Sequence, residues 1–228
     1  MGQERQRDND LMVDILCNII EFRNGEGGAH VRHIRVLARL LLEQLVKRTD
    51  RYGLTARDIE VIELTAALHD IGKIALSSDI LNKPGQLKPE EFSVMRDHAM
   101  IGANMLLELG LSMDEPVVKS AYEICRWHHE RWDGSGYPDG LAGDDCPISA
   151  QAVALADVYD ALTTDRIYKK ALPHEVAVKL ILEGQTGAFN PLLLQCLESI
   201  ASALPEKLEQ VEKQFSQVVD CDEPLRES

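Results

Sequence analysis

Histidine and carboxylate side chains recur along this 228-residue chain in a pattern that could hold metal ions. Six of the seven histidines lie between positions 30 and 129, several of them beside acids. The candidate ligands are five histidines and three acids: Glu26, His30, His69, Asp70, His98, His128, His129 and Asp157. Imidazole mixed with carboxylate suits Fe, Mn, Zn or Ni better than Mg or Ca. Eight ligands exceed what one ion takes, so the pattern predicts two or three ions with Asp70 as a bridge, a site suited to hydrolysis of a phosphate ester.

Each of these residues also has an ordinary structural explanation. A single histidine on an apolar helix is more often hydrogen-bonded within the core, and an adjacent His-Asp pair is frequent by chance. Asp157 lies in the apolar segment ALADVYDAL, where it could pair with an arginine, because an unpaired carboxylate is costly to bury. The whole set is harder to explain in this way. Its members come from successive predicted helices, and helical bundles build metal sites from ligands on facing helices.

Helical periodicity dominates the chain and predicts an all-α bundle with no strand and no internal repeat. Thr55 and Asp58 form a capping-box pattern at the start of one helix, and Ser149 is the predicted cap of another. The expected helices are 8–23, 31–45, 55–68, 89–109, a fifth from 114 or 115 to 128–129, and 149–162, followed by two or three over about 174–183, 191–201 and 204–218. We assign 1–24 to a linker with a lead-in helix and 25–228 to one domain.

Two segments rich in glycine and proline interrupt the helices, at 72–88 and 130–148. Both are predicted to be irregular loops. A loop as long as the second, without regular structure, is more often functional than merely connecting.

Composition limits the partners of the protein. The net charge of −14, from 24 basic and 38 acidic residues, disfavours binding to a nucleic-acid polymer but permits a small anion where metals reverse the local charge. No apolar run approaches the roughly 20 residues needed to cross a bilayer. The five cysteines form no CxxC pair, which is typical of reduced thiols. We therefore expect a cytoplasmic chain with no membrane partner.

Several motifs in order resemble the HD-GYP domain, a branch of the HD superfamily of metal-dependent phosphohydrolases. They are HDIGK at 69–73, ILNKPGQL at 80–87, EEF at 90–92, HHERWDGSGYPDGLAGD at 128–144 and ADVYDALTTDRIYKK at 156–170. Gly136-Tyr137-Pro138 matches the signature that gives the family its name. The resemblance implies a helical bundle that hydrolyses cyclic di-GMP to pGpG or GMP, with iron or manganese as the metal.

The resemblance also implies roles for individual residues. The eight candidate ligands match the family's metal ligands, and Glu26 matches the position associated with a third metal. Lys73 matches an active-site lysine and joins Asp70 as a catalytic residue. Tyr137, Arg166 and Lys169 match residues that contact the dinucleotide. Tyr137 could instead pack its loop on the bundle, and Lys169 could be a solvated surface charge.

Four positions depart from the family pattern. His33 and Gln151 stand where arginine is usual, Ile167 where proline is usual, and Asn190 where aspartate is usual. None is a ligand. Two could weaken the support of the ligands, and we therefore expect an effect on the rate of the reaction more than on its nature.

Two other functions stay open from the sequence. One is a sensor or protein-docking module that binds a cyclic dinucleotide with little turnover. The other is a phosphodiesterase of another cyclic dinucleotide, such as cyclic GMP-AMP. HD-GYP domains often follow a receiver or sensor domain, so we expect one upstream. The 8–23 segment would then form a homodimer contact or transmit a signal, or it would pack on the bundle.

Overall fold

The computed structural model describes residues 29–165 and 170–219, with side chains placed as far as Lys213. The α-helices are α2 (Ala29–Arg48), α3 (Ala56–Ala66), α4 (Ser78–Leu81), α5 (Pro89–Glu108), α6 (Pro116–Trp127), α7 (Ile148–Thr163), α8 (His174–Leu182), α9 (Pro191–Ile200) and α10 (Leu204–Val219). Short 3-10 helices are η1 (Ile71–Ala75), η2 (Gly143–Asp145) and η3 (Ala201–Ala203). The predicted all-α fold is confirmed. The expected 8–23 helix and the boundary at 24/25 lie outside the described residues and stay predictions.

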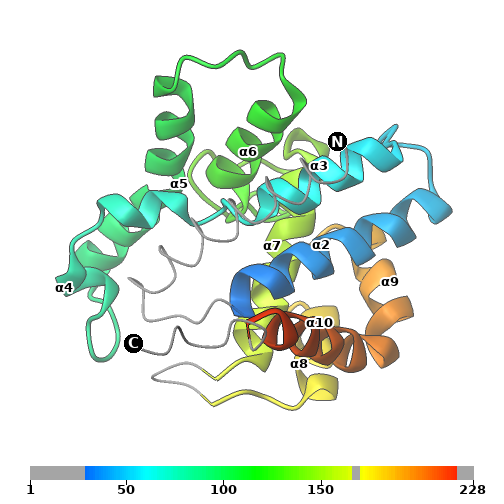
Figure 1. Ribbon diagram of the computed structural model, residues 1–228. Helices are drawn as coiled ribbons and strands as arrows, with labels where there is room; N and C mark the ends of the chain where they lie inside the picture. Colours follow the sequence, from blue (N-terminus) through cyan, green and yellow to red (C-terminus); the bar gives the residue numbers. More distant parts are fainter. Residues whose placement is uncertain (1–28, 166–169, 220–228) are drawn as a thin grey trace, which may run out of the picture.

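Helix α2 is the central element of the bundle, with α3, α7, α9 and α10 packed against it (Figure 1). Its apolar stripe includes Ile34, Leu37, Leu41 and Leu45, each at most 1% exposed. Burial of each such side chain contributes about 1.5–3 kcal/mol. Helix α2 can therefore hold the first predicted ligand, His30, in a fixed place in its first turn.

Helix α3 begins as predicted but ends earlier than predicted. Thr55 and Asp58 form the expected capping box. The helix ends at Ala66 rather than Leu68, because the chain tightens there into bonds from the Leu68 amide to Thr65 (3.0 Å) and from the His69 amide to Ala66 (3.3 Å). This tight turn changes the direction of the chain at His69-Asp70.

The segment 72–88 contains more regular structure than the predicted loop. It includes the last part of η1 and the single helical turn α4. Gly72 is the reason that η1 can lie directly on α5. A Cβ atom at Gly72 would overlap the carbonyl oxygen of His98 and lie 2.6 Å from the backbone nitrogen of Gly102. The two backbones meet here, which places HDIGK against the helix that carries His98.

Helix α7 also differs from its prediction at its start. It begins at Ile148 with Pro147 in the cap position, so Ser149 is not the cap. The Ser149 hydroxyl instead donates to Glu123 of α6 at 2.7 Å. Residues 149–156 are all buried, so α7 is a core helix rather than an amphipathic one.

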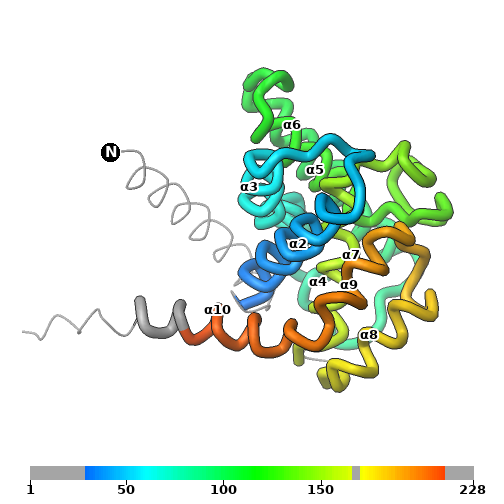
Figure 2. Tube along the Cα trace, turned by 90° about the vertical axis from the view of Figure 1, so that its right-hand side faces the viewer, coloured from blue at the N-terminus to red at the C-terminus, as the bar shows by residue number. Residues whose placement is uncertain are grey.

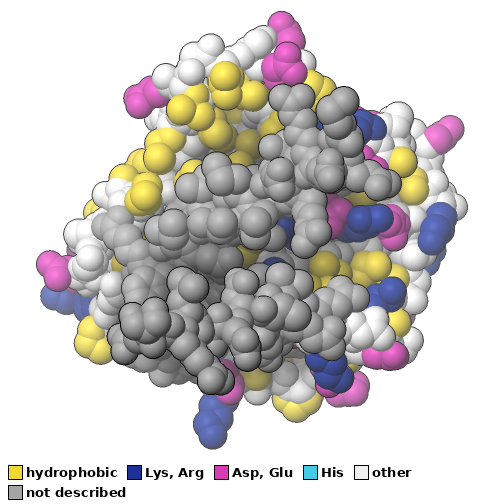
Figure 3. Space-filling view, in the orientation of Figure 1, with side chains coloured by type: hydrophobic (Ala, Val, Ile, Leu, Met, Phe, Trp, Pro, Cys, Tyr) yellow, Lys and Arg dark blue, Asp and Glu magenta, His cyan; other side chains and the backbone are white. Residues whose placement is uncertain are grey.

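The hairpin of α5 and α6 projects from the bundle, and apolar side chains are visible over its end in Figure 3. Leu107, Leu109 and Leu111 are 45%, 65% and 55% exposed there. In the described part of the chain, no helix is both long and apolar enough to span a bilayer.

We predict that Gly72→Ala lowers the free energy of unfolding by about 3 kcal/mol, at the upper end of overpacking costs, because backbone atoms of α5 cannot move aside locally. Urea unfolding of the metal-free chain measures the change. Gly102→Ala is the matched comparison, since its Cβ would meet Gly72 and Ile71 at 3.2 Å and need only a small shift. A loss for Gly72→Ala no larger than that for Gly102→Ala would contradict this account of the contact.

Candidate metal centre

Seven of the eight predicted ligands converge in the structure, and they form two groups. One group contains Asp70, His98, His128 and His129, and the other contains His30, His69 and Asp157. Within each group, one possible ligand atom from every residue lies within 4.8 Å of the others. The eighth, Glu26, lies outside the described residues. Five helices meet at this cluster. They contribute the ends of α3 and α6, the middle of α5 and α7, and the start of α2.

The imidazole rings face one another through nitrogens that carry lone pairs. The Nε2 atoms of His30 and His69 are 3.3 Å apart, and so are those of His98 and His128. The Nδ1 atoms lie against acceptors at hydrogen-bond distance, which are Asp160 for His30, Ala66 O for His69, Met95 O for His98 and Ile124 O for His128. These acceptors place a proton on Nδ1, so in the neutral form of each ring Nε2 carries a lone pair that faces its neighbour. A bound cation would relieve the repulsion between these lone pairs.

Asp70 connects the two groups. Its Oδ2 lies 3.3 Å from His69 Nε2 and accepts a bond from Lys73 Nζ at 2.5 Å. Its Oδ1 lies 3.2 Å from His98 Nε2 and 3.8 Å from His128 Nε2. That buried oxygen accepts no hydrogen bond within the described residues. The orphaned oxygen beside imidazole nitrogens fits a bound cation, and the histidine-carboxylate donor set fits a transition metal.

Burial and neighbouring charges keep the cluster ready to bind a cation. Burial, reinforced by the nearby His69 and His98 rings, lowers the pKa of His128 to about 3. Burial likewise holds the pKa of His129 well below its usual range. Burial opposes ionisation of Asp70, but Lys73 and the adjacent His69 outweigh it and hold the pKa of Asp70 well below its usual range. The His128 and His129 rings are thus neutral and the Asp70 carboxylate is charged at pH 7. Burial opposes protonation of His30, but the hydrogen bond to Asp160 outweighs it and raises the pKa of His30.

Asp160 belongs to the site but was missed by the sequence reasoning. It lies one helical turn after Asp157 on α7 and is 1% exposed. Its two oxygens meet the Nδ1 atoms of His30 at 2.7 Å and His33 at 2.6 Å. Burial opposes its ionisation, yet the bonds to these two histidines lower the pKa of Asp160. A second acid in the apolar run ALADVYDAL was the signal that could have revealed it.

The loop 130–148 is anchored by Glu130, a second missed residue. Its buried carboxylate accepts the backbone N–H groups of Asp139, Gly140 and Leu141 at 2.8–3.1 Å. Gly136 packs so closely on the loop's start that a Cβ atom there would overlap the backbone of Glu130 and Arg131. The loop is therefore folded tightly back beside the two histidines that precede it.

Tyr137 lies over the histidine cluster, and Arg96 covers it from outside. The Tyr137 ring stacks on the His129 ring, with centroids 4.6 Å apart and planes inclined by 26°. The Arg96 guanidinium lies 4.2 Å from the centre of the same ring. Burial, with Asp70 as a smaller contributor, raises the pKa of Tyr137 well above its usual range. The Tyr137 ring thus stays neutral. The exposed Arg96 guanidinium, held against this ring, lies at the edge of the cluster.

The other predicted contacts to substrate are only partly described. Lys73 lies beside Asp70, as its position in HDIGK suggests. Arg166 and Lys169 lie outside the described residues, as does Ile167, so their predicted roles stay predictions.

Two of the departures from the family pattern contact each other. The Asn190 side-chain amide donates to Gln151 Oε1 at 2.8 Å, and both side chains are buried. Gln151 in turn donates to the Gly143 carbonyl at 3.3 Å, and it also bonds the Cys146 carbonyl. Neutral amides therefore join α7, the loop 130–148 and the start of α9 without leaving a buried charge.

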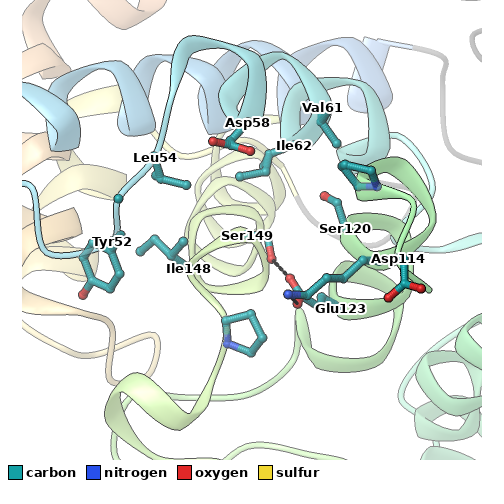
Figure 4. A pocket seen from close by; sticks show the side chains of 14 residues that line it. Tyr52, Leu54, Asp58, Val61, Ile62, Asp114, Ser120, Glu123, Ile148 and Ser149 are labelled. Atoms are coloured by element: carbon teal, nitrogen blue, oxygen red, sulfur yellow. Dashed lines mark hydrogen bonds and ion pairs between the residues drawn. The ribbon is translucent and has the colours of Figure 1, made fainter.

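A pocket of about 540 Å³ lies away from the cluster, between α3, α6 and the start of α7 (Figure 4). Residues near the first turns of these helices, including Asp58, Ser120 and Ser149, line it. The candidate ligands follow later on the same helices. The pocket and the histidine cluster are therefore separate places in the bundle.

The fold and the cluster define an all-helical protein with a buried site of facing histidines. A family model described as "HD domain" matches residues 14–192, and the chain belongs to this family. The resemblance to HD-GYP domains stated from the motifs is confirmed. A probable cyclic di-GMP phosphodiesterase of Vibrio cholerae is 41% identical over 196 residues, 84% of this chain and 44% of the relative. A 3'3'-cGAMP-specific phosphodiesterase 2 of the same organism is 36% identical over 198 residues, 82% of this chain and 36% of the relative.

Among solved structures, a cyclic GMP-AMP specific phosphodiesterase of Vibrio cholerae superposes with a TM-score of 0.64. At 16% identity, over 90% of this chain and 52% of that one, it supports the fold alone. The chain spans less than half the length of the two curated relatives named above.

We predict that the metal-free chain loses stability as the pH falls from about 6.5 towards 3. His128 is neutral in the fold but takes up a proton at its ordinary pKa of 6.5 once unfolded, so acid favours the unfolded state. The loss for this one group is at most about 1.4 kcal/mol per pH unit. Urea unfolding at several pH values, with chelator present, measures the slope. His128→Gln should show a shallower slope, and equal slopes would show that His128 does not titrate on unfolding.

Proposed function

We propose that this chain uses two or three divalent metal ions to hydrolyse cyclic di-GMP to pGpG or GMP. The observation that carries the proposal is the pair of 3.3 Å contacts between Nε2 atoms, His30 to His69 and His98 to His128. Each ring already meets an acceptor through Nδ1, so its Nε2 faces another imidazole nitrogen and not the carbonyl or carboxylate expected for a second hydrogen bond. The curated relatives named as phosphodiesterases support the reaction.

Two ion positions follow from the two groups. His30, His69 and Asp157 would hold one ion, and Asp70, His98, His128 and His129 the other. Asp70 would belong to both, since one of its oxygens faces each group. When bound, such ions supply Lewis-acid stabilisation of a phosphodiester and lower the pKa of water near them. The chain itself supplies imidazoles held in fixed positions and a carboxylate whose charge is maintained by Lys73.

The substrate side of the site would be cationic in an otherwise acidic protein. Lys73 would orient a phosphate oxygen next to Asp70, and Tyr137 would lie against the dinucleotide. Arg166 and Lys169 would add two positive charges, as the family motif implies. Arg96 stands over Tyr137 and is a further cation that an anionic ligand would meet.

Several finer features belong to the same proposal. Iron or manganese is the expected metal, and Glu26 would complete a third position. The protein would act in the cytoplasm, downstream of a receiver or sensor domain, with a homodimer contact formed by the 8–23 segment. The donor set supports the choice of metal, and the family resemblance supports the third position and the upstream domain.

The decisive experiment loads the full chain anaerobically with Fe²⁺ or Mn²⁺ and follows products from cyclic di-GMP. We expect pGpG or GMP, and a loss of about a hundredfold or more for Asp70→Asn, on the scale of removing one preorganised electrostatic contact. Asp97→Asn is the control, an exposed acid beside His98. If the metal-loaded chain does not hydrolyse cyclic di-GMP, the proposed substrate is wrong. Turnover of cyclic GMP-AMP by the same sample would then select the alternative substrate suggested by the second relative.

Glu26→Ala tests the third position. If Glu26 is a ligand, elemental analysis should find one metal fewer per chain than in the unchanged protein, while the two positions built from described residues remain filled. Unchanged metal content together with unchanged activity would remove Glu26 from the ligand set.

A further inference from the structure

His33 shares the carboxylate that orients the first candidate ligand. His30 and His33 are three residues apart on α2 and therefore project from the same side of the helix. Asp160 accepts from His30 through Oδ2 and from His33 through Oδ1, and Thr164 adds a bond to Oδ1 at 3.0 Å. The position of Asp160 thus depends on His33 as well as on His30.

The far side of His33 faces helix α10. Its Nε2 atom is buried, makes no hydrogen bond within the described residues, and lies 3.6 Å from Glu212 Oε1. Arg32, the neighbour of His33, holds Glu212 through two bonds of 2.9 and 2.6 Å. Helix α10 is thereby attached along α2 at this point (Figure 2).

These contacts form a continuous path from α10 to the metal centre. The path runs from Glu212 to His33, then to Asp160, and then to His30. We infer that His33 and Glu212 are positioning residues, through which the C-terminal helix sets how firmly His30 presents Nε2 to the ion shared with His69 and Asp157. Glu212 lies beyond residues 14–192, the part matched by the HD family model, so membership of the family does not by itself supply this contact.

The physical reason lies in the tautomer of His30. A ligating histidine is oriented by the acceptor of its other nitrogen, and loss of such a partner typically costs about 10–100-fold in metal affinity. Asp160 can play this part only while its own position is fixed. Without His33, only Thr164 would remain on Oδ1, and the carboxylate could turn away from His30. Glu212 attracts the opposite edge of the His33 ring and keeps that ring in place.

The inference rests on the proposed metal site, so one measurement avoids metal altogether. In the metal-free full chain, ¹⁵N NMR of the imidazoles reports how fast the His30 Nδ1 proton exchanges with water. The His30 signal is assigned as the one that disappears in His30→Gln. We expect Glu212→Gln to speed this exchange relative to the unchanged chain, because a less firmly held Asp160 would protect the His30 proton less. The control is Glu209→Gln, which breaks a pair with Lys213 on the same helix and should leave the rate unchanged.

The second measurement titrates Mn²⁺ into the same variants by calorimetry. Glu212→Gln should weaken one binding step about tenfold and leave the step that belongs to the Asp70, His98, His128 and His129 group unchanged. His33→Asn keeps a side-chain nitrogen near the position of Nδ1. Its Mn²⁺ affinity at this step should lie between that of the unchanged chain and that of His33→Leu. Equal weakening of both steps, together with a lower unfolding temperature, would show a merely structural role and overturn the inference.

The two proposals fail in different ways. A chain that binds no Mn²⁺ but shows faster His30 exchange in Glu212→Gln refutes the metal site and retains the positioning path. A chain that binds Mn²⁺ normally, with equal exchange in Glu212→Gln and Glu209→Gln, refutes the positioning path and leaves the proposed function standing.

Discussion

The close approach of imidazole Nε2 atoms is the constraint on which the rest of the structure depends. Two lone pairs 3.3 Å apart repel each other, and burial removes the water that would screen them. The bundle must therefore hold His69 and His128 in place, and it does so at the ends of α3 and α6, where the Ala66 and Ile124 carbonyls each meet both the backbone N–H and the ring Nδ1 of the histidine. One carbonyl at each helix end thus fixes the backbone and the ring of the same residue.

Buried carboxylates perform three different tasks around this cluster, and their partners distinguish them. Asp70 has an oxygen without a hydrogen bond in the described residues, and it faces the rings. Asp160 is fully engaged by His30, His33 and Thr164, so it orients rather than ligates. Glu130 is occupied by three backbone N–H groups and fixes a loop. An isolated buried charge would be costly, and each task here depends on which compensating groups the fold provides.

Much of this arrangement could be predicted from the sequence because its strongest signals are local. Helical periodicity located the long helices, and the spacing of histidines and acids identified seven residues that the fold brings together. The missed features depend on contacts between distant segments. The role of Asp160 depends on its contact with His30 of α2, 130 residues away in the chain. The need for glycine at position 72 depends on the backbone of α5. The early end of α3 and the start of α7 at Ile148 follow from local competition for carbonyl groups and from Glu123 as a partner for Ser149.

The departures from the family pattern show why substitutions need to be considered in pairs. Taken singly, Gln151 and Asn190 each suggest a lost charge and weaker support for the site. In the fold they hydrogen-bond each other, so neither leaves a buried group unsatisfied. A neutral amide pair avoids the desolvation cost of burying ions, which often offsets the attraction between them. His33 likewise still donates to Asp160, and through Glu212 it ties that carboxylate to a helix at the far end of the chain. At these three positions, hydrogen bonds between other side chains around the histidine cluster stand in place of the usual charged residues.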